Sequence, residues 1–473
     1  MRRTTTLTAA TLLGLTLLAP TTAATAVGET CRGEAATLVG GGRVYEITGT
    51  EGRDVVVTNG SSRVDTLGGD DLVCITGRDA GSGTTYGIDI DTGAGGDVVD
   101  GTAADSWGAD VVLGEGADRF EGGDSDDDVT AGVVTVEGSD VVYTDTVSDV
   151  LLGGGGDDSL RGGQEGLPNR DVLHGESGND GLGFVGTITD GSVLDGGAGN
   201  DRLNLGLAAG ENVLDNAAGQ FRRGAVIVSR WTSVESFYLT DPATGTADLD
   251  IIGSDADEEF WLDDSSRVTA DLGGGDDEIS VAAILPDGSR VAGGEGRDGF
   301  RFGTTERNVE WNLAEGVVRV DDGTTTPATG FEDAFVSAPS VRLRGTDGDN
   351  ALVANSCDGV LDGRDGRDSL DLRSDSVFET FRSCAEKMVF LGGRGHDRMG
   401  SRSGSVDRMV GGRGNDHFDS VGGNDRVFGG PGRDRALMGE GRDAFYGGPG
   451  RDRVDGQQDR DLCRAERTLR CER

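Results

Sequence analysis

The chain has 473 residues, of which 84 are glycine and only 5% are aromatic, and its formal net charge is -42. So much glycine and so few aromatic residues disfavour one thick hydrophobic core and favour an elongated repeat architecture. The acidic charge repels nucleic acid and anionic membranes and attracts divalent cations, so we expect no nucleic-acid partner.

Residues 1–26 have the pattern of a secretory signal peptide. Arg2 and Arg3 precede an apolar run over residues 7–18, and the small residues of Ala24-Thr25-Ala26 provide a cleavage site. No later segment is apolar enough to span a bilayer. We therefore expect a secreted, extracellular protein that is cleaved near Ala26, does not insert into membranes and is monomeric.

Three segments are expected after the signal peptide. Residues 27–204 are predicted to form an N-terminal β-roll of degenerate repeats with insertions, and residues 205–345 a β-rich segment of atypical coils or hairpins that continue the stack. Residues 346–473 are predicted to form a C-terminal β-roll. In the first segment, phased aspartates recur mostly nine residues apart but sometimes 13 apart. The longer steps indicate either loops on two-strand coils or wider three-strand coils, and both remain open.

The clearest repeat is nine residues long and occurs six times in tandem between Gly411 and Arg464: GGRGNDHFD, SVGGNDRVF, GGPGRDRAL, MGEGRDAFY, GGPGRDRVD and GQQDRDLCR. Glycines near the start permit a tight turn, and an aspartate occupies the sixth place each time. The last three residues are predicted to form a short strand whose middle side chain points inward.

Two nonapeptides make one coil of 18 residues, so aspartates two repeats apart should stack on one edge. One edge is predicted to carry Asp416, Asp434 and Asp452, and the other Asp425, Asp443 and Asp461. On this basis we expect Asp434 to have stacked partners on both sides and Asp416 to have mainly one.

The repeats GGRGNDHFD, GGPGRDRVD and GGAGNDRLN resemble hemolysin-type, or RTX, calcium-binding repeats. This resemblance implies an all-β fold, an elongated right-handed parallel β-roll or β-helix solenoid, with calcium ions in the turns. Large members of the family often attach the repeats to a protease, a lipase or a pore-forming part, and no such part is visible here. The N-terminal signal and a cysteine-containing tail also differ from the family's toxins.

Stacked carboxylates need a cation. At the coil spacing of about 4.8 Å, and an effective dielectric of roughly 20, two carboxylates repel by about 3 kcal/mol. Calcium takes about 6 to 8 oxygens at about 2.3 to 2.6 Å, so an ion between coils can reach carboxylates above and below, with turn carbonyls completing its shell. The candidate calcium ligands are Asp416, Asp425, Asp434, Asp443, Asp452, Asp461, Asp397, Asp407, Asp140, Asp149, Asp158, Asp201, Asp277, Asp298 and Asp368.

Six cysteines in an exported chain indicate disulfides, although six allow about 15 connectivities. Pairing of sequence neighbours is the simplest hypothesis: Cys31 with Cys74, Cys357 with Cys384, and Cys463 with Cys471. The last bond would fold the tail over the open end of the solenoid and cap it.

The main hypothesis is a non-enzymatic calcium-binding protein that folds or stiffens after export. The chain contains no H-E-x-x-H, G-x-S-x-G or P-loop motif. A second hypothesis is a cell-surface adhesion or carbohydrate-binding module stiffened by calcium, with Trp107, Trp231, Trp261 or Trp311 stacking on sugars. A third is a hydrolase with its site in residues 205–345.

Overall fold

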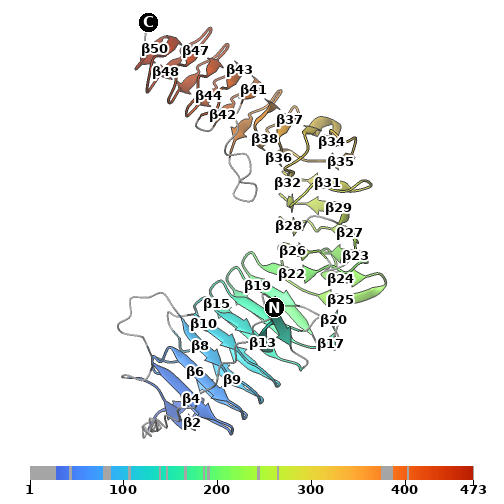
Figure 1. The fold of residues 1–473 in the computed structure, drawn as a ribbon, viewed down its shortest axis with the longest axis vertical. Helices are drawn as coiled ribbons and strands as arrows, with labels where there is room; N and C mark the ends of the chain where they lie inside the picture. Colours follow the sequence, from blue (N-terminus) through green and yellow to red (C-terminus); the bar gives the residue numbers. More distant parts are fainter. Residues whose placement is uncertain are drawn as a thin grey trace, which may run out of the picture.

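The computed structural model describes residues 28–41, 45–77, 87–104, 108–137, 140–144, 147–163, 168–184, 187–188, 192–241, 245–263, 266–373, 387–401 and 404–471. The predicted signal peptide and its cleavage site, Trp107 and Cys384 lie outside these residues. The chain winds into an elongated, curved solenoid of stacked strands (Figure 1). Apart from the 3-10 turn η1 (Leu313–Glu315), every described element is a β-strand. None of the described residues forms a helix long and apolar enough to cross a membrane.

One side of the solenoid is a single parallel sheet, here called the continuous face. Each of its strands pairs with the strand one coil before and one coil after, while β4 and β50 at the ends have one described partner each, so the sheet is open. Its strands are β4 (Glu46–Thr50), β6 (Arg63–Leu67), β8 (Ile88–Asp91), β10 (Ala109–Val112), β12 (Asp128–Thr130), β16 (Ser159–Gly162), β19 (Gly181–Phe184), β22 (Arg202–Gly206), β26 (Ser236–Thr240), β28 (Glu259–Leu262), β30 (Glu278–Val281), β32 (Gly299–Gly303), β36 (Asp333–Ser337), β38 (Ala351–Asn355), β40 (Ser369–Leu372), β42 (Arg398–Gly400), β44 (His417–Asp419), β46 (Arg435–Leu437), β48 (Arg453–Asp455) and β50 (Arg467–Leu469).

The opposite side, here called the divided face, consists of an 8-stranded and a 16-stranded sheet. The 8-stranded sheet contains β3 (Leu38–Val39), β5 (Val55–Val57), β7 (Leu72–Cys74), β9 (Val98–Asp100), β11 (Arg119–Glu121), β15 (Val150–Gly155), β18 (Val172–Ser177) and β21 (Val193–Ala198). The 16-stranded sheet contains β23 (Gly210–Asp215), β24 (Gln220–Arg223), β25 (Val226–Arg230), β27 (Ala247–Ile252), β29 (Arg267–Gly274), β31 (Arg290–Glu295), β33 (Val309–Asn312), β34 (Val317–Val320), β35 (Thr325–Thr329), β37 (Ser340–Arg344), β39 (Asp358–Asp362), β41 (Lys387–Arg394), β43 (Arg408–Arg413), β45 (Arg426–Phe428), β47 (Ala444–Tyr446) and β49 (Leu462–Arg464).

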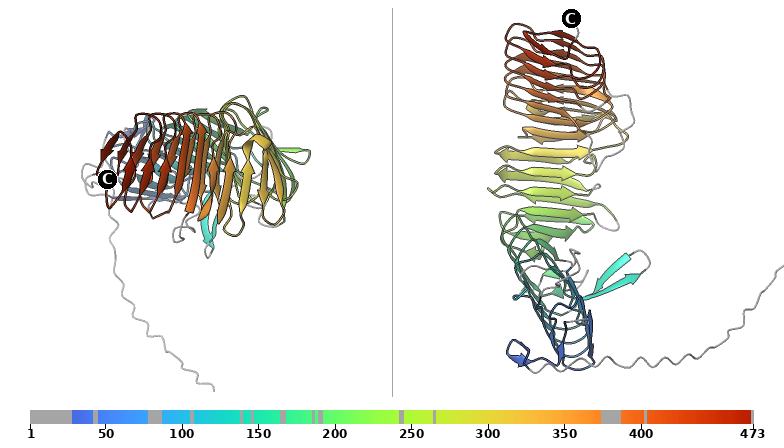
Figure 2. Two further views of the ribbon diagram at one scale, coloured as in Figure 1. Left: turned by 90° about the horizontal axis from the view of Figure 1, so that it is seen from above. Right: turned by 90° about the vertical axis from the view of Figure 1, so that its left-hand side faces the viewer.

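Most coils have one strand on each face. The long aspartate step from Asp127 to Asp140 runs into an inserted hairpin, whereas the step from Asp158 to Asp171 includes residues 168–169, which form a short third strand. The clearest insertion is the antiparallel hairpin of β13 (Val133–Glu137) and β14 (Asp140–Thr144), which projects from the stack (Figure 2). Two further short strands, β17 (Pro168–Asn169) and β20 (Thr187–Ile188), pair with each other beside the coils. Between β23 and β35 the divided face includes antiparallel strands.

The core is a single file of inward side chains between the two faces. In the tandem repeats the residue two places after the aspartate is fully or almost fully buried, as the period predicts. These residues are Phe418, Val427, Ala436, Phe445 and Val454. The same holds upstream for Leu151, Leu160, Leu173, Leu182 and Leu203.

Disulfides are placed at both ends of the solenoid. Cys31 bonds to Cys74 beside the antiparallel pair β1 (Thr30–Cys31) and β2 (Glu34–Ala35), and Cys463 bonds to Cys471. The predicted bond between Cys463 and Cys471 is therefore present, and both residues pack against the core at the C-terminal end. The third predicted bond involves Cys384 and cannot be placed, because that residue lies outside the described part of the chain.

Candidate metal-binding columns

Aspartates that immediately precede strands are stacked along the edges of the solenoid. Each carboxylate Oδ1 accepts a hydrogen bond from the backbone N–H of the equivalent residue one coil earlier. The N–H of Asp416 donates to Asp434 Oδ1 at 2.9 Å, and the N–H of Asp434 donates to Asp452 Oδ1 at 3.0 Å. The same bond joins Asp425 N–H to Asp443 Oδ1 at 2.8 Å. The predicted stacking of the tandem aspartates on two edges is therefore present.

The stacked residues form three columns, each named here by its position. The long column precedes the strands of the continuous face, and the N-terminal and C-terminal columns precede strands of the divided face. The long column contains Asp127, Asp158, Asp180, Asp201, Glu235, Glu258, Asp277, Asp298, Glu332, Asn350, Asp368, Asp397, Asp416, Asp434, Asp452 and Glu466. The N-terminal column contains Asp54, Asp71, Asp97, Asp118, Asp149 and Asp171. The C-terminal column contains Asp407, Asp425, Asp443 and Asp461.

All but one of the predicted ligands therefore lie in a column. The exception is Asp140, which is the first residue of β14 and pairs with Glu137 in the projecting hairpin. Asp140 follows Asp127 by 13 residues, as several phased aspartates follow one another. The coil from Asp127 to Asp158, however, is 31 residues long and contains the hairpin, so Asp140 falls within the insertion. The structure places Asp140 away from the stacked aspartates.

One expectation about neighbours was wrong. Asp416 was expected to have mainly one stacked partner, but the N–H of Asp397 donates to Asp416 Oδ1 at 3.0 Å. Asp416 and Asp434 therefore both have a neighbour on each side. The tandem repeats begin at Gly411, so the sequence suggested that the column ends at Asp416. The column continues through the preceding coils, whose repeats match the nonapeptide less well.

Column members without the nonapeptide pattern were not predicted as ligands. Glutamate replaces aspartate at several places, and the longer side chain still reaches the N–H of the preceding coil: Glu332 Oε2 accepts from Asp298 at 3.1 Å, and Glu466 Oε2 from Asp452 at 2.7 Å. The sequence signal for them is an acidic residue directly before a strand with a buried second residue. The members of the long column that were not predicted as ligands are Asp127, Asp180, Glu235, Glu258, Glu332, Asn350 and Glu466.

The second carboxylate oxygen, Oδ2, has a different environment from Oδ1. In many column aspartates it is buried and accepts no hydrogen bond from any described group. It lies against the first glycine of its own repeat: a Cβ added at Gly411 would be 2.2 Å from Asp416 Oδ2. Where glycine occupies this place, as at Gly411, its lack of a side chain leaves room for the carboxylate; Leu272 and Met438 occupy the corresponding place before Asp277 and Asp443. The aspartates with such an Oδ2 are Asp158, Asp180, Asp201, Asp277, Asp298, Asp368, Asp397, Asp416, Asp434, Asp443 and Asp452.

Burial and neighbouring carboxylates make ionisation of the columns unfavourable without a cation. Loss of solvent raises the pKa of Asp425 to about 8, and Asp407 and Asp443 raise it further, against the lowering effect of the accepted backbone hydrogen bond. Asp158 likewise has a pKa of about 8. The pKa is about 7 for Asp277, Asp368, Asp434 and Asp443, for the same principal cause.

The columns fit calcium in the chemistry of their donors. They offer carboxylate oxygens, which calcium prefers, and several of these oxygens are buried without a hydrogen-bond donor. The described residues contain no group of three or more Asp, Glu, His or Cys side chains around one point. Calcium bound in the columns would need further oxygens, such as the carbonyls of the turns, to complete its shell.

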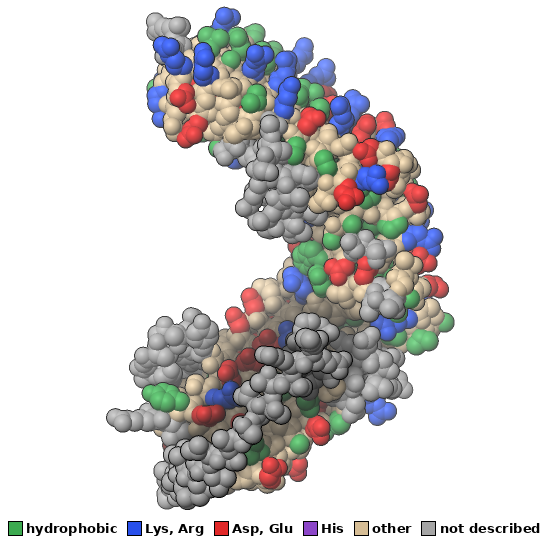
Figure 3. All heavy atoms as spheres, in the orientation of Figure 1, with side chains coloured by type: hydrophobic (Ala, Val, Ile, Leu, Met, Phe, Trp, Pro, Cys, Tyr) green, Lys and Arg blue, Asp and Glu red, His purple; other side chains and the backbone are tan. Residues whose placement is uncertain are grey.

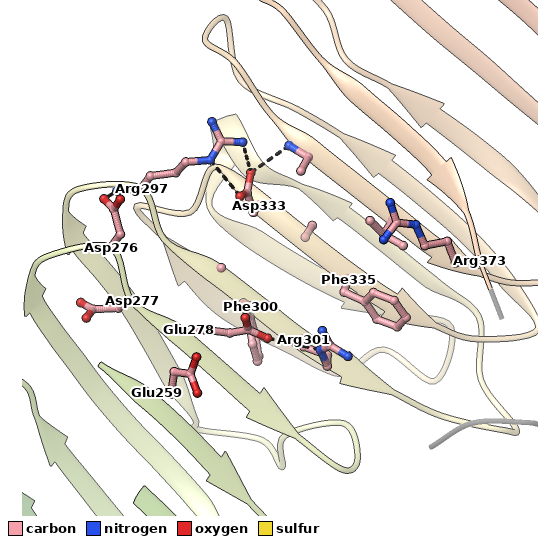
Figure 4. Close-up of a pocket in the computed structure, with 14 residues that line it drawn as sticks. Glu259, Asp276, Asp277, Glu278, Arg297, Phe300, Arg301, Asp333, Phe335 and Arg373 are labelled. Carbon is pink, nitrogen blue, oxygen red and sulfur yellow. Dashed lines mark hydrogen bonds and ion pairs between the residues drawn. The ribbon is translucent and has the colours of Figure 1, made fainter. Parts of the chain in front are cut away.

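A hollow of about 490 Å³ lies in the middle of the solenoid, where the hydrolase hypothesis would place a site (Figure 4). Its charged side chains are largely paired: Arg297 contacts Asp333 at 2.7 Å, and Arg301 contacts Glu278 at 3.3 Å. No histidine, cysteine or serine is among the described residues that line it. The hollow thus gives the hydrolase hypothesis no support.

The three tryptophans in the described part of the chain, Trp231, Trp261 and Trp311, do not form a sugar-stacking surface either. Trp231 is 5% exposed and Trp311 is 0% exposed, so both are core residues. Trp261 points outward, but the guanidinium of Arg202 lies over its ring, 4.6 Å from the centroid. Substituting Trp231 would therefore test folding rather than binding.

Comparison with known families supports the geometric description. A family model of the RTX calcium-binding nonapeptide repeat matches residues 107–133, 134–165, 191–209, 402–436 and 439–464. No curated protein matches this chain. The chain thus carries RTX-type calcium-binding repeats at both ends of its solenoid, and the columns also extend through intervening coils that the family model does not match.

Proposed function

Because the chain carries RTX calcium-binding repeats, we propose that it is a secreted, non-enzymatic protein whose β-roll folds or stiffens when it meets extracellular calcium. The observation that carries this proposal is the set of columns of buried carboxylates, stacked one coil apart, whose Oδ2 atoms accept no hydrogen bond from described groups. Bound calcium would supply positive charge between the carboxylates.

The proposal explains why the columns occupy positions that are unfavourable in the absence of a cation. Buried like charges with raised pKa values weaken the calcium-free fold, so free energy of calcium binding contributes directly to folding. Calcium is scarce in the cytosol and plentiful outside cells, so the chain would remain unfolded or flexible until it is exported. The two placed disulfides are also those of an oxidising compartment.

Calcium should increase both the β-sheet signal and the thermal stability of the mature chain. The experiment compares circular dichroism spectra and unfolding midpoints in chelator, in millimolar magnesium and in millimolar calcium. We expect the midpoint to rise by more than about 10 °C in calcium, since saturation at 100 times Kd stabilises by about 2.7 kcal/mol for each site. Identical spectra and midpoints in chelator and calcium would rule out the proposal.

The position of an aspartate in its column should determine how many calcium ions its loss removes. Asp443 stacks between Asp425 and Asp461, whereas Asp461 is the last described member of that column. Asp443→Ala should therefore remove about twice as many ions as Asp461→Ala in calcium titration calorimetry. Asp419→Ala is the matched control, because Asp419 lies in β44 outside the columns, and it should leave the stoichiometry unchanged. Equal losses from both column variants would contradict this register.

A further inference from the structure

Arginines line the outer surface of the C-terminal coils on the continuous face. Arg435 pairs in register with Arg453, and Arg453 with Arg467, so their side chains are one coil apart, about 4.8 Å. They point outward because the next residues, Ala436 and Val454, are buried in the core. Two more arginines, Arg433 and Arg451, lie in the turns before these strands. We call these five residues, Arg433, Arg435, Arg451, Arg453 and Arg467, the arginine face; Figure 3 shows Lys and Arg side chains gathered at this end of the molecule.

The arginine face lacks the compensation that outward arginines have elsewhere on the same sheet. In the middle coils, Arg301 contacts Glu278 on the neighbouring strand at 3.3 Å, and Arg297 contacts Asp333 at 2.7 Å. None of the five arginines of the arginine face forms an ion pair with a carboxylate of the described chain. Like charges in direct register across strands are destabilising unless a ligand of opposite charge compensates them.

The five arginines line one hollow. Its volume is about 540 Å³, and its other lining residues are Asp434, Asp452 and Glu466 of the long column. Asp434 and Asp452 are each 1% exposed, so the solvent-facing side chains of the hollow are mainly guanidinium groups.

Calcium in the columns would change the charge of this block. Residues 404–471 contain 12 arginines and 12 acidic residues, of which seven are column aspartates. Without calcium the block is formally neutral, and the buried carboxylates beneath the arginine face oppose an anionic ligand. Once calcium neutralises the columns, Glu466 included, four acidic residues remain against 12 arginines. The block then has an excess of positive charge, in a protein whose total is strongly negative.

We propose that the arginine face binds a sulfated polysaccharide when calcium occupies the columns; this inference rests on the proposed function. Guanidinium groups bind oxyanions through paired, charge-assisted hydrogen bonds, and a row of them suits a polymer with repeated anionic groups. Sulfate esters bind calcium weakly and so stay available in the millimolar calcium that the columns require. Single-stranded nucleic acid is disfavoured because its binding sites stack bases on open aromatic rings. The half-buried ring pair here, Phe428 and Tyr446, is stacked on itself at 5.2 Å and flanked by Arg408 and Arg464.

The test measures binding of the full mature chain to a heparin oligosaccharide in millimolar calcium and low salt. The variant Arg435→Gln, Arg453→Gln, Arg467→Gln removes three charges from the arginine face. A matched control, Arg413→Gln, Arg426→Gln, Arg442→Gln, removes three exposed charges from the same block but from other positions. We expect the first variant to weaken binding by at least about tenfold, since hydrogen bonds to charged groups contribute about 1.5–3 kcal/mol each. The control should weaken it by less than about twofold.

Each outcome separates this inference from the proposed function. Calcium calorimetry on both variants should give the wild-type stoichiometry, which shows that the roll is folded. Three results would overturn the arginine face as a sulfate site. The wild-type chain could take up calcium normally and fail to bind heparin, or both triple variants could lose heparin affinity equally. Desulfated heparin or single-stranded DNA could also bind as tightly as heparin. Absence of calcium uptake by the wild-type chain would instead overturn the proposed function.

Discussion

In the absence of calcium, the protein should become more stable as the pH falls from about 8 to about 5.5, whereas the calcium-bound protein should become less stable over the same range. A carboxylate paired with a cation has a lowered pKa and makes a protein less stable as the pH falls below about 5. The opposite behaviour is expected here because the column aspartates are buried next to one another. The pKa values of Asp425 and Asp158 are about 8, and those of Asp434 and Asp443 about 7.

The sign follows from which state holds the proton. An unfolded aspartate titrates near pH 3.9, so above about pH 5 it is ionised in the unfolded chain. In the calcium-free fold, an aspartate with a pKa of about 7 keeps its proton up to that pH. The folded state therefore binds more protons than the unfolded state between about pH 4 and pH 8, and stability decreases as pH rises through that window. Calcium requires the ionised form, so protons compete with it and the dependence is reversed.

Unfolding midpoints measured in chelator and in millimolar calcium, at several pH values between 5.5 and 8, test this prediction. The variant Asp425→Asn, Asp443→Asn should unfold at a higher temperature than wild type in chelator at pH 8, and should gain less from calcium. Asn350 shows that a neutral side chain fits a column, because its Oδ1 accepts from Thr346 N–H at 2.8 Å and its Nδ2 donates to the Glu332 carbonyl at 2.9 Å. A calcium-free protein that gains stability from pH 5.5 to 8 would show that the columns are not strained by charge.

The regular repeats made the C-terminal columns predictable, because a fixed period of nine residues determines both the strand and the coil. Spacing alone was enough to predict that Asp425 and Asp443 stack on one another. In the structure the N–H of Asp425 donates to Asp443 Oδ1 at 2.8 Å. The pairing of Cys463 with Cys471 was predicted from their nearness in the sequence, and the inward place of Cys463 from the repeat.

Spacing failed where the coil length varies. Asp140 was counted through an inserted hairpin, and Asp110, phased by the same counting, lies one residue after the column position: Ala109, not Asp110, donates its N–H to Asp127 Oδ1 at 2.7 Å. Glu235 and Glu258 were not predicted as ligands because their coils lack the regularly spaced glycines of the nonapeptide. The sequence does not show where each insertion begins and ends. Each insertion changes which aspartates stack on one another, while the alternation of inward and outward side chains in the strands stays the same.

Replacing the first glycine of a single repeat with alanine should be among the most damaging substitutions in the C-terminal coils. Gly429 does not adopt positive φ, so its backbone conformation is open to any residue. A Cβ at this position would, however, be 2.3 Å from Asp434 Oδ2 and 2.7 Å from the Gly447 carbonyl oxygen. The first contact is with the column carboxylate and the second with the backbone of the next coil, so neither can be relieved locally.

Relief would require the Asp434 carboxylate to turn away, which would break the hydrogen bond from Asp416 N–H to its Oδ1 at 2.9 Å. We therefore expect Gly429→Ala to destabilise the calcium-bound protein by about 1–3 kcal/mol, the usual cost of overpacking, and to reduce calcium stoichiometry. Gly348→Ala is the matched control: its φ is also not positive, and its nearest neighbour, Thr346 Oγ1, is 3.6 Å away. The control should leave stability unchanged or raise it slightly. If Gly429→Ala took up calcium like wild type and unfolded at the same temperature, the carboxylate of Asp434 could not lie against its own turn, and the columns would need another arrangement.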